Sequence, residues 1–298
     1  MLEFEKLLDS VYVLKVPNGG EWTGVFLLTG AENMLIDCGP SSTAVDEYII
    51  PALLKLGLKA DDIAYVTNTH AHGDHSGGDF RFLRESGAKL ANGAETAAKL
   101  ADPLPHSIKT RAKWPEYSPK APGFIQDNRT DIILKDGDML GGRLRIIYTP
   151  GHDTECVSFF DTETRSLFTG DSLQEYGTIG EHDAAGVAFY KSLPDYRRTL
   201  ELLKACEAEN IFAAHDFKPY GFCAIGRESA ERMLAVSCEA VERYDRDIRE
   251  MLASGMTDIA GITSELLHRL NSVTPEYLFM AMYTVDAHIK EISAAQRG

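Results

Sequence analysis

The stretch VTNTHAHGDHSGG, residues 66–78, constrains this chain more than any other part of it. Within six consecutive positions it carries three imidazoles and one carboxylate, those of His70, His72, Asp74 and His75. Imidazole and carboxylate groups suit Zn²⁺, Fe²⁺ or Mn²⁺ as ligands. Because alternate side chains of a loop point to two adjacent places, this spacing favours two metal ions over one.

The cluster follows a predicted strand. The apolar, β-branched run IAYVT, residues 63–67, ends just before it, so we expect the histidines in a loop at the C-terminal end of that strand. Ligands usually bind at this edge of α/β folds, because the rigid strand fixes where the loop begins. Gly77 and Gly78 are expected to permit the tight turn that brings the loop back.

Three further strand-like runs end in small residues followed by one metal-binding side chain. They are RIIYTPGH, which ends at His152, SLFTGD, which ends at Asp171, and NIFAAH, which ends at His215. A site for two ions needs more ligands than one loop supplies, so we expect these three residues to complete it. A lone histidine is more often structural than a ligand, and the strand-end context is what argues for His215.

Composition restricts the partners of the chain. A formal net charge of −15 disfavours nucleic acid and anionic membranes, since both are bound through positive potential, and a small-molecule substrate fits better. The five cysteines are scattered and never form a C-x-x-C pair, which is typical of reduced thiols in a cytoplasmic protein. Neither a signal-like N-terminus nor a run of about 18 apolar residues is present, so we expect a cytoplasmic protein with no membrane contact.

The order of predicted elements suggests two similar halves and a helical end. Short strands and turns fill the first forty residues, a helix follows at 41–57, and a second β-rich stretch with its own helix and strand echoes this pattern up to His215. Residues 101–130 hold five prolines and predict a long surface loop. After residue 226 only helical periodicity remains. We therefore expect a catalytic domain at 1–226 and a helical extension at 227–298, which would serve as a lid or a homodimer contact.

These motifs resemble those of the metallo-β-lactamase superfamily of metal-dependent hydrolases. THAHGDH is similar to the family's H-x-H-x-D-H motif, TPGH, FTGD and AAH to its later ligand motifs, and MLIDCG to its early strand-end motif. The resemblance implies a four-layer αββα sandwich, here with a helical C-terminal extension. It also implies a first metal ion on His70, His72 and His152, a second on Asp74, His75 and His215, a bridge through Asp171 and a supporting role for Asp37.

The resemblance further implies hydrolysis of a small ester, thioester, lactone or phosphoester. Two ions about 3.5–4 Å apart can share a hydroxide that acts as the nucleophile. Asp74 would orient this hydroxide and then help to protonate the leaving group. Zinc is the expected metal, with iron and manganese as alternatives.

Within the superfamily, the chain resembles the glyoxalase II and lactonase-like group. Asp171 and the lack of a signal peptide argue against antibiotic hydrolysis, and the acidic charge argues against a ribonuclease. GHDTEC departs from the G-H-T-x-G-H pattern of many thioesterases and lactonases, with Asp153, Glu155 and Cys156 in the later positions, which argues against a plain glyoxalase II. Two alternatives stay open: a metal-binding sensor or partner-binding protein, and a metal-dependent oxidoreductase of the dioxygenase type.

Candidate substrate residues lie in the segments that follow two of the ligands. Tyr176, His182 and Tyr190 lie in the stretch after Asp171, and Lys218 lies just after His215. Each could donate a hydrogen bond to an oxyanion or a leaving group. For the remaining histidines we expect ordinary surface or helix-face positions: His106, His268 and His288.

Overall fold

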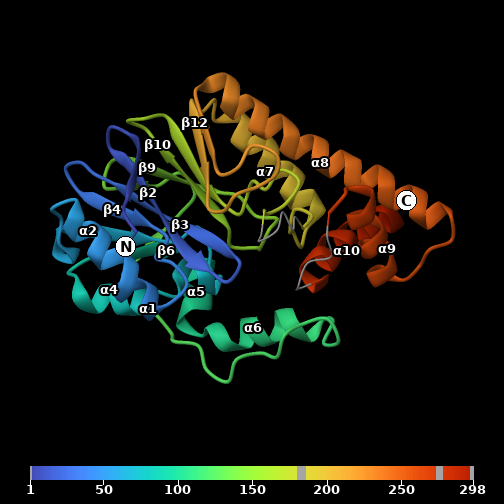
Figure 1. Ribbon diagram of the computed structural model, residues 1–298, viewed down its shortest axis with the longest axis horizontal. Coiled ribbons are helices and arrows are strands. Elements are labelled where there is room, and N and C mark those ends of the chain that lie inside the picture. Colours follow the sequence, from blue (N-terminus) through green and yellow to red (C-terminus); the bar gives the residue numbers. More distant parts are fainter. Residues whose placement is uncertain (1, 180–185, 273–277, 296–298) are drawn as a thin grey trace.

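The structure, a computed structural model, describes residues 2–179, 186–272 and 278–295. Two β-sheets lie face to face, and helices cover the outer face of each sheet (Figure 1). The layers run helix, sheet, sheet, helix, so the predicted αββα sandwich is confirmed.

The first sheet contains seven strands in sequence order. They are β1 (Glu5–Leu8), β2 (Val11–Asn18), β3 (Glu21–Leu28), β4 (Asn33–Ile36), β5 (Ile63–Thr67), β6 (Lys89–Gly93) and β7 (Ile132–Leu134). The first four pair antiparallel, as a meander of the short strands predicted in the first forty residues, and β4 to β7 pair in parallel. Between β4 and β5 the chain forms α1 (Ser42–Ala44), a π-helical turn (Val45–Ile49) and α2 (Ile50–Lys55). Ser41 begins this helix, because its Oγ accepts the Ala44 N–H at 3.1 Å.

The second sheet repeats this plan. Its strands are β8 (Met139–Leu140), β9 (Leu144–Tyr148), β10 (Val157–Asp161), β11 (Ser166–Gly170), β12 (Asn210–Ala213) and β13 (Cys223–Ile225). β8 to β11 form an antiparallel meander, and α7 (Leu193–Ala205) then connects β11 to the parallel strand β12. Each half is thus a meander followed by a helical crossover, which is the echo seen in the sequence.

Side chains of the central strands alternate between two cores. Val13 and Phe26 face the second sheet, where the ring of Phe26 lies 5.2 Å from that of Phe168. Leu14 and Val25, their neighbours in the chain, pack under the helices instead. Because both faces of the sheet are covered, these strands are apolar at almost every position.

Residues 101–130 differ from the expected loop. After α5 (Ala94–Ala101) the chain forms α6 (Pro103–Ala112), so the prediction of an irregular segment was wrong for 103–112. The five prolines were the basis of that prediction, but Pro103 stands at the first helical position, where no N–H is needed. The hydroxyl of Tyr283 donates to Thr110 O at 2.8 Å, and this bond ties α6 to the C-terminal helices.

The C-terminal region is helical, as predicted. It forms α8 (Arg227–Ala253), α9 (Ile259–Arg269) and α10 (Leu278–Ala295). α8 and α7 pack together over the second sheet, in a core that includes Leu200, Val241 and Tyr244 (Figure 1). Thr274 and Pro275 form a sequence pair typical of the first positions of a helix, and they lie outside the described residues. All five cysteines are free, and none of the helices described is long and apolar enough to cross a membrane.

Arg143 joins the two sheets through buried polar contacts. Its Nε and Nη2 donate to the two carboxylate oxygens of Asp161, both at 2.8 Å. Its Nη1 donates to Thr29 O at 2.8 Å and its Nη2 to Ser10 Oγ at 2.9 Å, in two turns of the first sheet. Asp161 is fully buried, so its negative charge needs this guanidinium as a stabilising partner.

Asp161→Asn should therefore lower the free energy of unfolding by about 3–5 kcal/mol, because it leaves a buried charge without its partner. Denaturant unfolding measures this change. Glu163→Gln is the matched control, since the exposed Glu163 carboxylate lies 3.3 Å from the same guanidinium and its removal should cost only about 0–1 kcal/mol. Equal losses in the two variants would contradict the role given to Asp161.

Candidate metal centre

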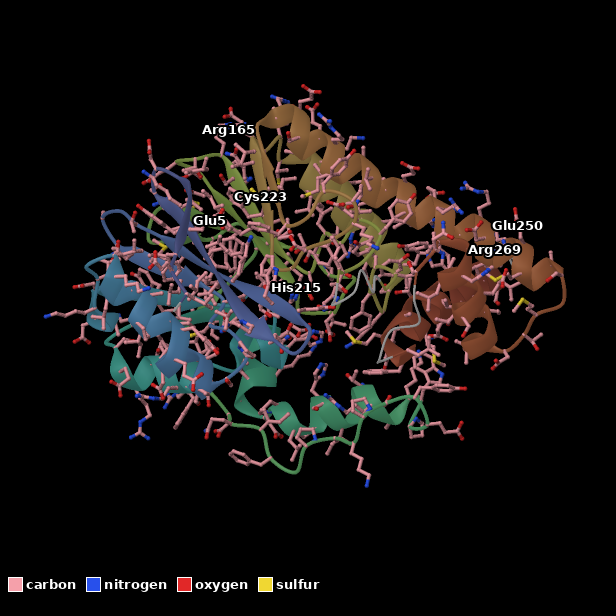
Figure 2. The ribbon with its side chains drawn as sticks, viewed as in Figure 1. Glu5, Arg165, His215, Cys223, Glu250 and Arg269 are labelled. Atoms are coloured by element: carbon pink, nitrogen blue, oxygen red, sulfur yellow. The ribbon has the colours of Figure 1, made fainter. Side chains whose placement is uncertain are left out.

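The predicted metal-binding side chains and the supporting residue Asp37 meet where five strands end. Asp37 follows β4, His70 follows β5, His152 follows β9, Asp171 follows β11 and His215 follows β12. Figure 2 shows His215 in the middle of the molecule, away from Glu250 and Arg269 on the C-terminal helices. Residues from both sheets thus form one cluster, which is buried except around His72 and Asp74.

The loop that carries the first four donors is held by close backbone contacts. It runs through the short helix α3 (Gly73–Ser76) into α4 (Asp79–Glu85). Gly77 and Gly78 have φ of −63° and −86°, which any residue can adopt, so the expected conformational reason for these glycines was wrong. The glycines are needed because a side chain has no room at either position. A Cβ would lie 2.2 Å from Pro40 O at Gly77 and 2.0 Å from Cys38 O at Gly78.

A first group of four side chains converges on one point. His72 Nδ1 lies 3.1 Å from His152 Nε2. Asp171 Oδ2 lies 3.5 Å from His152 Nε2 and 4.0 Å from His70 Nε2. One nitrogen or oxygen from each of the four lies within 4.8 Å of the others, which is close enough to surround a single cation.

A second group lies beside the first. Asp74 Oδ2 is 3.4 Å from both His75 Nε2 and His215 Nε2. The other oxygen of Asp171, Oδ1, lies 3.6 Å from His75 Nε2 and 3.3 Å from His215 Nε2. Asp171 therefore directs one oxygen at each group.

Backbone and side-chain acceptors orient most of these imidazoles from outside. His152 Nδ1 donates to Phe189 O, and His215 Nδ1 donates to Trp22 O, each at 2.7 Å. A carbonyl oxygen can only accept, so in the neutral rings Nε2 carries the lone pair that faces the cluster. His75 Nδ1 donates in the same way to Asp37 Oδ2 at 2.8 Å.

Several atoms at the centre lack partners that the protein could provide. His70 Nε2, His75 Nε2 and Asp171 Oδ1 are buried and have no hydrogen bond to any described residue. Buried polar atoms of this kind are costly and rare. Divalent cations would satisfy them, and a set of imidazoles and carboxylates fits Zn²⁺, Fe²⁺ or Mn²⁺.

The charges of the cluster also favour a cation. Burial alone would raise the pKa of Asp171. The imidazoles of His215 and His75 lower this pKa by more than burial raises it, so that it stays well below its usual range. Burial lowers the pKa of His152 to about 4, which keeps its lone pair free at neutral pH. Burial also lowers the pKa of His215, yet Asp171 and Asp74 raise it to about 9. A proton on His215 balances the negative charge of Asp171 and Asp74, and a bound metal ion would balance the same charge in its place.

The sequence profile of the Metallo-beta-lactamase superfamily matches residues 22–215, a range that contains every residue of this cluster. The chain belongs to this superfamily. Among its relatives, a beta-lactamase-like protein 2 homolog of Caenorhabditis elegans is 30% identical over 218 residues, which cover 71% of this chain and only 63% of that protein.

Two other relatives carry names of hydrolytic enzymes. Hydroxyacylglutathione hydrolase of Methylococcus capsulatus is 27% identical over 242 residues, which cover 79% of this chain and 78% of that one. An acyl-coenzyme A thioesterase of Bos taurus is 28% identical over 219 residues, which cover 68% and 75%. The predicted family is thus confirmed, and these names support the predicted enzyme class.

Solved structures agree on the fold. A metallo-beta-lactamase family protein from Thermus thermophilus aligns with a TM-score of 0.72 and 21% identity, and the alignment covers 97% of this chain and 96% of that one. A subclass B3 metallo-beta-lactamase of Bradyrhizobium japonicum aligns with a TM-score of 0.57 and 22% identity over 85% of this chain and 96% of that one. At these identities the likeness concerns the fold alone.

The pocket that two of the predicted substrate residues line contains none of the metal-binding side chains. Tyr176 and Lys218 line a pocket of about 440 Å³ that also contains Arg243 and Arg269. The hydroxyl of Tyr190 is fully buried and lies 2.6 Å from His288 Nε2, so it already has a partner inside the protein. His182 lies outside the described residues.

The other histidines divide in a way that the sequence did not predict. His268 is exposed, as expected, but His288 is fully buried beside Tyr190. His106 lies on α6, and its Nε2 is 3.3 Å from Asp153 Oδ2, next to the metal-binding loop. The expected helix-face position of His106 is therefore correct, but its contact with Asp153 was not predicted, because α6 itself was not foreseen.

Sequence reasoning also missed residues that hold the ligands in place. Asp37 accepts not only from His75 but also from Thr69, whose N–H and hydroxyl donate to Oδ1 and Oδ2 at 2.8 and 2.9 Å. Gln174 Oε1 accepts from Phe189 N at 2.6 Å and so holds the residue whose carbonyl orients His152. The only available signal for Thr69 and Gln174 was their short distance in sequence from His70 and Asp171.

Gly78→Ala should lower the free energy of unfolding by about 1–3 kcal/mol, because a methyl group would press on the backbone of Cys38. Chemical denaturation measures the loss. Gly73→Ala, in the same loop, is the control, since a Cβ there would meet nothing within 4 Å. If Gly78→Ala were as stable as Gly73→Ala, the close approach could not be the reason for this glycine.

Proposed function

We propose that this protein is a dinuclear metal-dependent hydrolase of a small ester, thioester, lactone or phosphoester. The position of Asp171 carries the proposal. Its Oδ2 faces His70 and His152, and its Oδ1 faces His75 and His215. A carboxylate placed in this way can give one oxygen to each of two cations.

The two groups would hold the ions with ordinary donors. The first ion would lie among His70, His72, His152 and Asp171, and the second among Asp74, His75, His215 and Asp171. Bound divalent ions in such a pair lower the pKa of water and polarise the bond to be cleaved. Zinc is the proposed metal, with iron or manganese as alternatives that use the same donors.

Asp74 is the residue that we propose for proton transfer. Its side chain is 27% exposed, whereas the neighbouring His75 is fully buried, so it can reach a substrate. Burial raises its pKa, but the imidazoles of His75 and His215 lower it well below its usual range, so the carboxylate is ionised at neutral pH. It can therefore accept a proton from the attacking water and return it to the leaving group.

Thioesters are the first substrates to test. The names of two relatives specify an acyl derivative of glutathione and an acyl derivative of coenzyme A, and both thiols form thioesters with acyl groups. Tyr176 and Lys218 would contact only a part of the substrate away from the metal ions, because the pocket that they line contains none of the metal-binding side chains. A sensor or an oxidoreductase would share the same metal ligands, so turnover is what separates these alternatives from a hydrolase.

The helical end would form one wall of the site. We assign the chemistry to residues 1–226 and treat 227–298 as an extension that packs against them. Support comes from α10, where Thr284 Oγ1 donates to Ala188 O at 2.6 Å and the ring of Tyr283 lies 5.8 Å from that of Phe189. Phe189 in turn lies 4.8 Å from the ring of His152, so α10 is well placed to act as a lid.

Metal removal should abolish hydrolysis. The purified protein is expected to contain about two metal ions per chain and to cleave at least one member of a panel of acyl thioesters, lactones, phosphodiesters and sulfate esters. Dialysis against a chelator should remove both the metals and the activity, and added Zn²⁺ or Mn²⁺ should restore both. A protein that holds two ions and cleaves nothing in this panel would count against a hydrolase.

Asp74→Asn should reduce turnover by about 10²–10⁴-fold, the usual contribution of a positioned acid–base group. The first group does not contain Asp74, so metal analysis of the variant should still find an ion bound there. Asp102→Asn, which changes an exposed carboxylate between α5 and α6, is the control and should retain full activity. Normal turnover by the Asp74 variant would remove this residue from the proposed mechanism.

A further inference from the structure

His72 is oriented differently from the other imidazoles of the cluster. His70, His75, His152 and His215 turn Nε2 inward, and their Nδ1 atoms lie against acceptors outside the cluster. His72 instead turns Nδ1 inward, 3.1 Å from His152 Nε2. Its Nε2 therefore points outward, where it lies 3.3 Å from Asp153 Oδ2.

We propose that Asp153 is a positioning residue of the metal centre, which accepts the Nε2–H of His72 and so keeps the Nδ1 lone pair directed at the first group. The inference rests on the proposed function, because it assigns a task in metal binding. Acceptors of this kind fix the tautomer and the ring orientation of a metal-binding histidine. Phe189 O and Trp22 O do the same for His152 and His215.

Asp153 is itself held rigidly. Its side chain is almost fully buried. Lys99 Nζ lies 3.0 Å from Oδ1, Lys191 Nζ lies 2.5 Å from Oδ2, and Thr154 N–H donates to Oδ1 at 2.8 Å. These contacts come from α5, from the segment before α7 and from the loop itself, so three parts of the fold determine where His72 points.

The same contacts argue against a third metal ion at this place. His72, His106 and Asp153 lie close enough together to surround a cation. Both oxygens of Asp153, however, already contact an ammonium group, and like charges at this distance repel. The two lysines thus already balance the negative charge that would attract an ion to this place.

This arrangement gives a physical reason for the unusual GHDTEC motif. Asp153 directly follows His152, so one short segment supplies a donor to the first group and the acceptor for His72. Glu155 shares Lys99 with Asp153, and Cys156 Sγ accepts the Asp153 N–H at 3.3 Å. All three residues that depart from the usual pattern therefore belong to one support for His72.

Metal binding by variants tests the proposal. Co²⁺ titration, read from its visible bands, and Zn²⁺ competition with a chromophoric chelator would be measured for the full chain and for Asp153→Ala. The variant should weaken one of the two binding events by about 10–100-fold and leave the other unchanged. His106→Ala is the matched control, because it removes a neighbour of the same carboxylate oxygen and should leave both affinities unchanged. Loss of an ion in the control would favour a third metal site and overturn the proposal.

The tautomer of His72 provides a readout that does not need bound metal. Long-range ¹H–¹⁵N NMR of the metal-free wild-type chain should show His72 protonated at Nε2, and Asp153→Ala should shift this ring toward the Nδ1–H form. An Nδ1–H ring in the wild type, or unchanged affinities in a folded Asp153→Ala protein, would overturn the proposal. If the variant does not fold, the wild-type spectrum decides. If the wild type binds no metal, the proposed function fails while the spectrum still tests the role of Asp153.

Discussion

The carboxylate of Asp171 is the contact on which the centre depends. Its two oxygens lie between 3.3 and 4.0 Å from the Nε2 atoms of four imidazoles. Two of these imidazoles follow β5 of the first sheet, and the other two follow β9 and β12 of the second. The cluster can therefore form only when the two sheets have packed together. The distances between its side chains depend on the packing of the aromatic core between the sheets.

The cluster is unfavourable for the protein alone, and this bears on both stability and function. Nitrogen and oxygen atoms face one another in a buried space without hydrogen-bond partners, an arrangement that normally costs stability. Stabilising contacts elsewhere, such as the buried pair between Arg143 and Asp161, hold the strands in place despite this cost. A bound cation would convert the same atoms into favourable contacts, so metal binding should also stabilise the fold.

The resemblance of the motifs to a known superfamily was sufficient to predict the αββα layers and the ligand set. Strands are rigid, and a donor just after a strand lies at one edge of its sheet, so the strand-end context of His152, Asp171 and His215 supported their place beside the first four donors. The helix α6 was missed, because the favourable position of Pro103 depends on where the helix begins. Of the acceptors only Asp37 was predicted; the backbone acceptors could not be, because every residue has a carbonyl and nothing marks those of Trp22 and Phe189. The contact between Lys99 and Asp153 joins residues 54 positions apart and needs the folded chain.

Anomalous X-ray diffraction from crystals loaded with Zn²⁺ or Mn²⁺ is the decisive test of a dinuclear centre, because it locates each ion by its own scattering. We expect two peaks about 3.5–4 Å apart, one on each side of Asp171. Their neighbours should be His70, His72 and His152 for one peak and Asp74, His75 and His215 for the other. A single peak, or a peak among His72, His106 and Asp153, would show that the centre is not the one proposed.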